Sequence, residues 1–456
     1  MRKNPINVRL LLVLVLVLVA AARAQSAPAA PQDSNRESQQ HSGAHDQMPA
    51  MSSHQMEMDK RPTSFLQAIQ QHSTSGTSAE PDSTPMPMLM TMKGRWMLMF
   101  HGEAFLNAVQ QSGPRGEDKI FSTNWFMPMA QTQLGPGKFT ARVMLSFEPA
   151  TVSHRYYPEL FQQGETAFGK SIIDGQHPHD FVMELAALYD LKIGEQSLLS
   201  FYFAPVGDPA MGPTAYPHRA SASENPIAPL GHHLEDSTHI ADDVITAGFT
   251  YKRARIEASG FHGREPDEFR WNIDSGKIDS WSLRGSVNPA PNWSAQYSFA
   301  HLTSPEALHP GEDLQRMTAS LMYNRPLSRG NWASTLLWGR NRNLQTGLVW
   351  NGYLAESTLR FKERNYVWGR IENVDRTSEL LPRGSELPGA AESIIGRVQA
   401  YTAGYERDLT LVPHLATGLG TQFTLYSTPA SLQSAYGSHP VGGLIFVRLR
   451  PVGNAH

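Results

Sequence analysis

Apolar and polar residues alternate along most of the chain after residue 94. Between residues 96 and 101, for example, Trp96 and Leu98 share one parity, and Met97 and Met99 share the other. Because successive side chains of a β-strand point to opposite faces of a sheet, this period predicts strands with one apolar and one polar face. About sixteen such segments can be recognised. Further clear examples are 138–148, 280–287, 293–299 and 445–450.

The gaps between these segments are alternately short and long. The short gaps are 135–137, 194–195, 253, 289–291, 328–330 and 363–364. The long gaps include 147–180, 205–240, 262–277 and 375–393. Transmembrane barrels of the bacterial outer membrane have short periplasmic turns, longer extracellular loops and an even number of strands. We therefore predict an all-β fold, an antiparallel transmembrane β-barrel of about 16 strands, with 14 or 18 as alternatives.

Residues 1–24 have the features of a signal peptide. Three basic residues, Arg2, Lys3 and Arg9, precede an apolar core that runs from Leu10 to Ala22. Small residues then form a cleavage site before residue 25. The mature chain is therefore expected to be exported, with residues 94–456 as a barrel in the cell outer membrane. No later apolar run reaches the length of about 18 residues that a membrane-spanning helix needs.

The charge and the cysteine content limit the classes of partner that the protein can have. The sequence contains no cysteine, so no disulfide framework and no lipid-anchored amino terminus are expected. Without the basic residues of the leader, 35 basic residues face 42 acidic ones, a net charge of −7. This balance argues against a nucleic acid partner. The expected partner is the lipid bilayer of the outer membrane.

Aromatic residues lie near the ends of several expected strands. Interfaces between membrane and water favour tryptophan and tyrosine, so we interpret these residues as girdles. They are Trp271, Trp281, Trp293, Trp332, Trp338, Trp350, Tyr353, Tyr366 and Trp368. The alternative is a secreted array of soluble β-sandwiches, which would not alternate its long and short gaps so regularly.

Residues 25–93 differ from the rest of the chain. They are rich in Ser, Pro, Gln, Ala, Met and His, a composition that cannot bury a core, so we expect a disordered periplasmic tail with one short helix near 64–71. Thirteen of the 18 methionines lie between Met48 and Met144. Thioethers select soft ions such as Cu(I) or Ag(I), and imidazole also accepts Cu(II).

These residues predict metal binding by the tail and by the first strand. The tail candidates are His41, His45, Met48, Met51, His54, Met56, Met58, Met86, Met88, Met90 and Met92. If Trp96 and Leu98 face lipid, then Met97, Met99 and His101 face the lumen, which would continue the soft-ligand path into the barrel. The alternative is that methionine provides adaptable apolar contacts.

A second group of candidate ligands lies in the long gap 205–240. It contains His232, His233 and His239 among several carboxylates, and imidazole with carboxylate suits Zn(II) or Cu(II). Such a loop can also fold inward and narrow the pore of a large barrel. A hydrogen-bonded loop stiffened by its prolines is the structural alternative.

The leader, the tail and the barrel together resemble the copper-resistance outer-membrane protein B family. The resemblance covers the leader and the Met/His-rich tail, including His41, His45, Met48 and Met51. It implies sequestration or export of copper across the outer membrane, with copper as the bound ion and a periplasmic metal-handling protein as a compatible partner.

Three functions are therefore compatible with the sequence. The first is a barrel that handles copper or a similar soft metal through its tail. The second is a general porin-like channel for small solutes, for which a homotrimer is a compatible assembly. The third is an enzyme or surface-binding protein that uses its extracellular loops. Nucleophile-elbow, phosphate-loop and zinc-protease motifs are missing from the sequence, so we expect no enzyme, with an outer-membrane hydrolase as the alternative.

Overall fold

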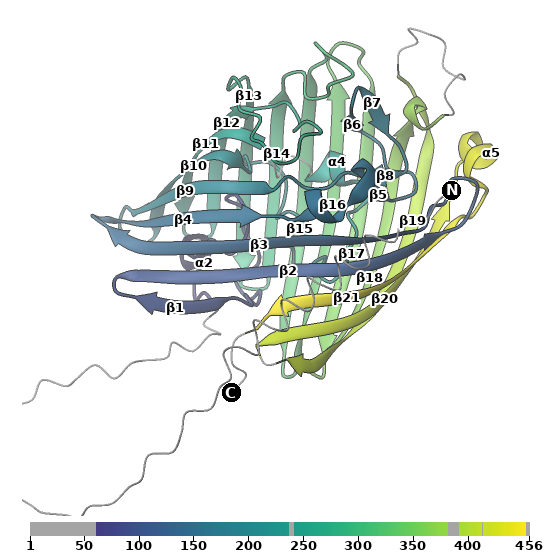
Figure 1. The fold of residues 1–456 in the computed structure, drawn as a ribbon. Helices are drawn as coiled ribbons and strands as arrows, with labels where there is room; N and C mark the ends of the chain where they lie inside the picture. Colours follow the sequence, from purple (N-terminus) through teal and green to yellow (C-terminus); the bar gives the residue numbers. More distant parts are fainter. Residues whose placement is uncertain (1–60, 237–240, 382–391, 413, 453–456) are drawn as a thin grey trace, which may run out of the picture. The chain divides into compact units, whose positions relative to one another are not determined.

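The computed structural model describes residues 61–236, 241–381, 392–412 and 414–452. Within them, sixteen strands form a closed antiparallel barrel (Figure 1). The strands are β2 (Trp96–Gln111), β3 (Lys119–Leu134), β4 (Gly137–Leu145), β9 (Val182–Lys192), β10 (Ser197–Gly207), β11 (Ala241–Tyr251), β12 (Ala254–His262), β13 (Ser280–Ala290), β14 (Trp293–Leu302), β15 (Leu314–Leu327), β16 (Gly330–Asn343), β17 (Val349–Phe361), β18 (Asn365–Thr377), β19 (Ile394–Val412), β20 (Leu415–Ser427) and β21 (Val441–Pro451). The predicted fold class and strand number are confirmed.

Pairing between the first and last strands closes the barrel. Residues 104–111 of β2 pair with β21, while residues 96–100 on the same edge of β2 pair with the additional short strand β1 (Leu89–Lys93). The other edge of β2 pairs with β3. The predicted alternation of short and long connections is also confirmed, because turns such as 135–136 and 328–329 alternate with long excursions such as 146–181.

The shorter elements are not part of the barrel wall. The helices are α2 (Phe65–Gln71), α3 (Glu148–Thr151), α4 (His232–Glu235) and α5 (Gln433–Tyr436), with 3-10 turns η1 (Ser153–Arg155), η3 (Ser378–Leu380) and η4 (Ala430–Leu432). Two small hairpin-like pairs join β5 (Tyr157–Pro158) to β8 (Gly175–Gln176) and β6 (Glu165–Ala167) to β7 (Lys170–Ile172). No helix in the described parts of the chain is long and apolar enough to cross a membrane.

The two faces of the barrel wall differ in polarity as predicted. On the outer face, Ile120, Ile256 and Ile445 each expose more than 60% of their surface. On the inner face, Arg142 and Arg448 are fully buried. An apolar belt around a closed barrel is stable only where lipid covers it. The protein is therefore a transmembrane barrel, and it lies in the cell outer membrane.

Three of the nine aromatic residues assigned to girdles face inward instead. Tyr366 and Trp368 are buried in the lumen, and Trp350 packs on the inner apolar clusters. The Trp368 indole donates a hydrogen bond to Gln422 (3.1 Å), and the Tyr366 hydroxyl donates one to Asp408 (3.1 Å). Polar partners inside the barrel thus hold the rings of Tyr366 and Trp368 there, and the girdle interpretation is wrong for all three residues.

Residues 61–93 also differ from the expected tail. They are folded, with α2 capped by Ser64 at the predicted helix, and Phe65, Leu66 and Ile69 are buried beside Leu198 of β10. We call residues 61–88 the luminal strap, because they run along the inner wall of the barrel. The predicted boundary at residue 93 therefore lies too late, since folded chain is already present at residue 61.

The long connection after β10 folds into the lumen, as the sequence suggested. Nearly all described side chains between 208 and 236 are buried. We call residues 208–236 the inward loop. Its helix α4 contacts β15, β16 and β17 on the far side of the barrel.

Candidate functional site in the barrel lumen

Arg142 of β4 holds the luminal strap against the barrel wall. Its guanidinium donates hydrogen bonds to the backbone oxygens of His72 (3.2 Å), Thr74 (2.6 Å) and Gly76 (2.6 Å). It also pairs with the carboxylate of Glu184 at 2.7 Å. Both charged side chains are fully buried, so this pairing offsets the cost of removing them from water.

Further polar side chains of the wall continue this attachment. Arg284 donates to the hydroxyl of Thr77 at 2.8 Å, and Asn288 donates to Asp82 at 2.7 Å. Asn324 donates to the backbone oxygen of Ser83 at 2.8 Å. The strap has little regular secondary structure, so these wall side chains supply partners for its backbone and side-chain polar groups.

Ion pairs hold the inward loop in a similar way. Arg219 pairs with Glu356 of β17 at 2.6 Å and with Asp236 at 3.2 Å. Arg370 of β18 donates to the backbone oxygen of Ala228 at 3.0 Å. His218 directly precedes Arg219, so the ion pairs that hold Arg219 also keep His218 inside the lumen.

Methionine side chains gather on one part of the inner wall. They come from the strap, β1, β2, β3, β4 and β9, and they surround Val206. The buried members are Met88, Met99, Met127, Met129, Met144 and Met183, with Met86, Met90 and Met97 packed against them. We call these nine residues the methionine cluster. Alternation on β3 settles the face of Met127 and Met129, which the sequence alone left open.

Two histidines border the methionine cluster. The ring of His101 on β2 lies 5.6 Å from that of His218, measured between centroids, and the Trp125 ring packs against both, at 5.1 and 4.2 Å. His218 Nε2 lies 3.4 Å from the sulfur of Met144. His101 Nε2 is buried and has no hydrogen-bond partner among the described residues.

A cavity of about 200 Å³ opens beside these rings. One part of its lining consists of Met86, Met88, His101, Trp125 and His218, and another contains Glu80, Glu103, Glu224, Asp408, Arg360 and Arg450. Burial raises the pKa of the strap residue Glu80 to about 7, although the charge of Arg219 acts in the opposite direction. The cavity is therefore lined on one part by thioether and imidazole side chains and on another by side chains that carry charges of both signs.

The predicted luminal positions of Met97, Met99 and His101 are confirmed. Met90 pairs with Met99 in the register of β1 and β2, and Met92 pairs with Met97 near the end of the hairpin, where Met92 is 49% exposed. The predicted ligands His41, His45, Met48, Met51, His54, Met56 and Met58 lie outside the described residues.

The loop histidines have carboxylate partners in a different part of the lumen. His232 lies 2.6 Å from Asp236, and His233 lies 3.1 Å from Glu165. Burial lowers the pKa of His233 to about 3. His239 lies outside the described residues. Within the described ranges, His, Asp and Glu side chains form no group of three or more with a metal-binding arrangement, so metal binding at these histidines stays a prediction.

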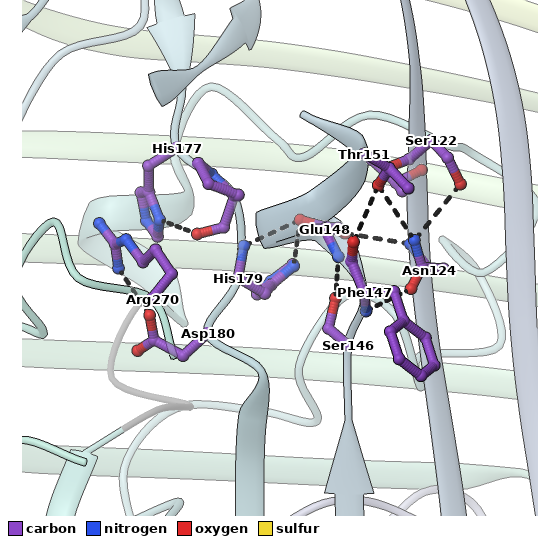
Figure 2. Close-up of polar contacts among 12 residues, drawn as sticks. Ser122, Asn124, Ser146, Phe147, Glu148, Thr151, His177, His179, Asp180 and Arg270 are labelled. Carbon is purple, nitrogen blue, oxygen red and sulfur yellow. Dashed lines mark hydrogen bonds and ion pairs between the residues drawn. The ribbon is translucent and has the colours of Figure 1, made fainter. Parts of the chain in front are cut away.

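Glu148 anchors the other long connection, 146–181. Its carboxylate accepts hydrogen bonds from the backbone of Asn124 (3.1 Å) and from both the backbone and the ring of His179 (2.8 and 3.0 Å), as Figure 2 shows. Burial acts to lower the pKa of His179, but the Glu148 carboxylate outweighs it and raises that pKa above its ordinary value. Nearby, Asp180 pairs with Arg270 at 3.3 Å. These contacts fasten the connection inside the barrel.

The closed sixteen-stranded wall, the apolar outer face and the loops folded into the lumen define a porin-like β-barrel of the outer membrane. No family model matches the chain, and no curated protein matches its sequence.

Solved structures with a similar fold include porins. The anion-selective porin from Comamonas acidovorans is 12% identical over 78% of this chain and 99% of that chain, with a TM-score of 0.48. The Salmonella typhi OmpF complex with daunomycin is 10% identical over 79% and 100%, also with a TM-score of 0.48. The loop L8 deletion mutant of OmpT from Vibrio cholerae is 9% identical over 78% and 99%, with a TM-score of 0.45.

Proposed function

We propose that this porin-like barrel binds a soft metal ion, Cu(I) or Ag(I), in its lumen and passes it across the outer membrane. The observation that carries the proposal is the methionine cluster. Thioethers bind soft ions without losing a proton, and they discriminate against harder ions such as Zn(II). Ligands grouped along a wall also allow an ion to move between sites, provided that each site binds it weakly enough to release it.

The composition of the cluster favours ligation over simple packing. Six of its seven fully buried residues are methionine. A second apolar cluster in the same barrel has eleven buried residues, and one of them, Met211, is a methionine. A third cluster consists of Phe, Tyr, Trp, Val, Ile and Leu. Aliphatic and aromatic side chains therefore fill apolar space elsewhere in this lumen, and sulfur is concentrated in one place.

The test is metal stoichiometry on the refolded mature chain. Cu(I) is supplied under anaerobic reducing conditions, Ag(I) is supplied separately, and bound metal is measured by elemental analysis after a weak chelator wash. The combined variant Met99→Leu, Met127→Leu and Met129→Leu keeps the side-chain volume, so folding should be retained. We expect it to lose bound metal, whereas the control Met322→Leu, a buried methionine outside the cluster, should not. Equal stoichiometry in all three proteins would refute the proposal.

A general channel for small uncharged or charged solutes is the second candidate. The mixed charges along the cavity favour it, because Glu103 and Arg450 face the same space as Arg360 and Asp408. Liposome swelling distinguishes the two functions. A general channel would admit sugars at a rate that the methionine variants leave unchanged. A soft-metal pathway would show little sugar entry and a silver flux that depends on methionine.

Two partners of this protein are also proposed: further copies of the chain in a homotrimer, and a periplasmic metal-handling protein. A general channel is compatible with a trimer, whose mass in mild detergent can be measured by light scattering. Delivery of copper to the periplasmic end of the barrel would require a donor protein, which crosslinking to the mature chain can identify.

A further inference from the structure

We infer that His101, His218 and Met144 form a discrete soft-metal centre in the lumen, a step that rests on the proposed function. The three side chains come from β2, from the inward loop and from β4, which are far apart in the sequence. Their meeting point borders the cavity, since His101 and His218 line it directly.

The first argument is the state of the His101 ring. His101 is 8% exposed, and its Nε2 atom is buried with no hydrogen-bond partner among the described residues. Leaving a buried polar atom unpaired destabilises the folded chain. A metal ion is a partner that imidazole nitrogen accepts readily. His101 therefore places an unpaired imidazole nitrogen, able to bind a metal ion, in a residue that lines the cavity.

The second argument is the contact between His218 and Met144. Nε2 of His218 lies 3.4 Å from the Met144 sulfur. Thioether sulfur is only a weak hydrogen-bond acceptor, so this contact gives little stability by itself. A nitrogen and a sulfur at this separation, with a second imidazole whose centroid lies 5.6 Å away, could share one ion after small side-chain rotations.

The surroundings favour a soft monovalent ion. Met127, the register partner of His101, and Met88 of the cavity lining place more sulfur around the site. Trp125 packs against both imidazole rings and covers one side of the site. The ligand set is neutral, which suits a single positive charge and gives a harder divalent ion little compensation.

The inward loop gives the site a further property. His218 is adjacent to Arg219, whose ion pairs with Glu356 and Asp236 fix the loop. The site is complete only while the loop stays inside the barrel. An extracellular connection thus supplies one ligand to an ion that the strand methionines also contact.

The test compares His101→Gln, His218→Gln and Met144→Leu with His309→Gln, a partly exposed loop histidine that serves as control. Competition with a chromogenic Cu(I) chelator measures affinity in the refolded mature chain, and heat-modifiable migration confirms that each barrel is folded. We expect each site variant to lower the affinity of the tightest site by about tenfold or more. X-ray absorption at one equivalent of Cu(I) should show mixed nitrogen and sulfur ligation in the parent chain. The variant that combines His101→Gln with His218→Gln should show fewer nitrogen ligands.

The outcomes separate the two proposals. Unchanged affinity and unchanged nitrogen ligation in folded site variants, with loss of binding in the methionine variant described above, would overturn the centre and leave the proposed function standing. Absence of Cu(I) and Ag(I) binding in the parent chain would overturn both. If a histidine variant fails to fold, Met144→Leu decides, because it preserves volume and removes only the sulfur.

Discussion

At the scale of single residues, the buried guanidinium of Arg142 supplies hydrogen bonds that a neighbouring strand would supply in a sheet. Arg142 satisfies three consecutive regions of strap backbone through His72, Thr74 and Gly76, and Glu184 balances its charge. The planar fork of arginine can hold several oxygens at once, which lysine cannot do in the same geometry. Irregular chain can therefore remain buried in the lumen without a regular hydrogen-bond partner.

Glu80 makes the docking of the strap dependent on pH. Burial raises the pKa of Glu80 to about 7 from an ordinary value of 4.5. A carboxyl group with a raised pKa in the docked state contributes stability that is fully present below its undocked pKa and is lost as pH rises through the docked pKa. Hydrogen exchange of residues 61–88 should therefore be slower at pH 5 than at pH 8, after correction for intrinsic exchange rates.

The variant Glu80→Gln provides the control. Glutamine is similar in shape and does not titrate, so the corrected difference in strap protection between the two pH values should largely disappear. A difference that persists in Glu80→Gln would show that another group governs the docking of the strap.

At the scale of elements, the strap and the inward loop depend on each other. Gly76 has φ of +57°, and a Cβ at this position would overlap the side chain of Asp208 at the start of the inward loop. Gly76 also donates a backbone hydrogen bond to Glu184 at 3.0 Å. A side chain at residue 76 would therefore disturb both elements and the ion pair that fixes them.

Gly76→Ala has a matched control in Gly135→Ala. Gly135 has the same φ of +57°, but a Cβ there would meet nothing within 4 Å. Both variants should incur backbone strain of about 1 to 2 kcal/mol, whereas only Gly76→Ala should also displace the strap. We expect faster protease cleavage within residues 61–88 for Gly76→Ala alone. Equal cleavage in the two variants would contradict the close packing of strap against loop.

The strands and loops could be predicted from the sequence because their signals are local. The two-residue period placed Met97, Met99 and His101 in the lumen. The count of alternating segments predicted about 16 strands, and the alternation of short and long gaps indicated an outer-membrane barrel. The strap could not be predicted in this way, because its burial depends on distant wall residues such as Arg142 and Asn324. His218 could not be singled out among the loop histidines for a similar reason, since its position beside Met144 depends on the folding of the inward loop, in which Arg219 pairs with Glu356 of β17.

At the scale of the whole molecule, the lumen is a filled interior with a limited cavity. The strap, the inward loop and the connection 146–181 occupy much of the space inside the sixteen strands. Pore conductance depends on the free cross-section and on the charges that line it. The barrel should therefore conduct less than an unobstructed barrel with the same number of strands.

Release of the inward loop should raise the conductance. Arg219→Gln leaves the carboxylates of Glu356 and Asp236 without their shared cation, and their repulsion should drive the loop outward. We expect a severalfold increase in single-channel conductance in planar bilayers. The control Arg329→Gln removes an exposed pair with Glu363 and should have no effect. Unchanged conductance in Arg219→Gln would mean that the loop stays in place without this pair.

The seam between β2 and β21 has a consequence for the order of assembly. Closure requires the first and last barrel strands to meet, and contacts so distant in sequence form late because long loop closure is slow. The strap precedes β2, and its partners on β4, β9, β13 and β15 are all closer to it in sequence than β21 is to β2. The barrel wall can therefore form around the strap, and pairing of β2 with β21 then closes a lumen that the strap already fills.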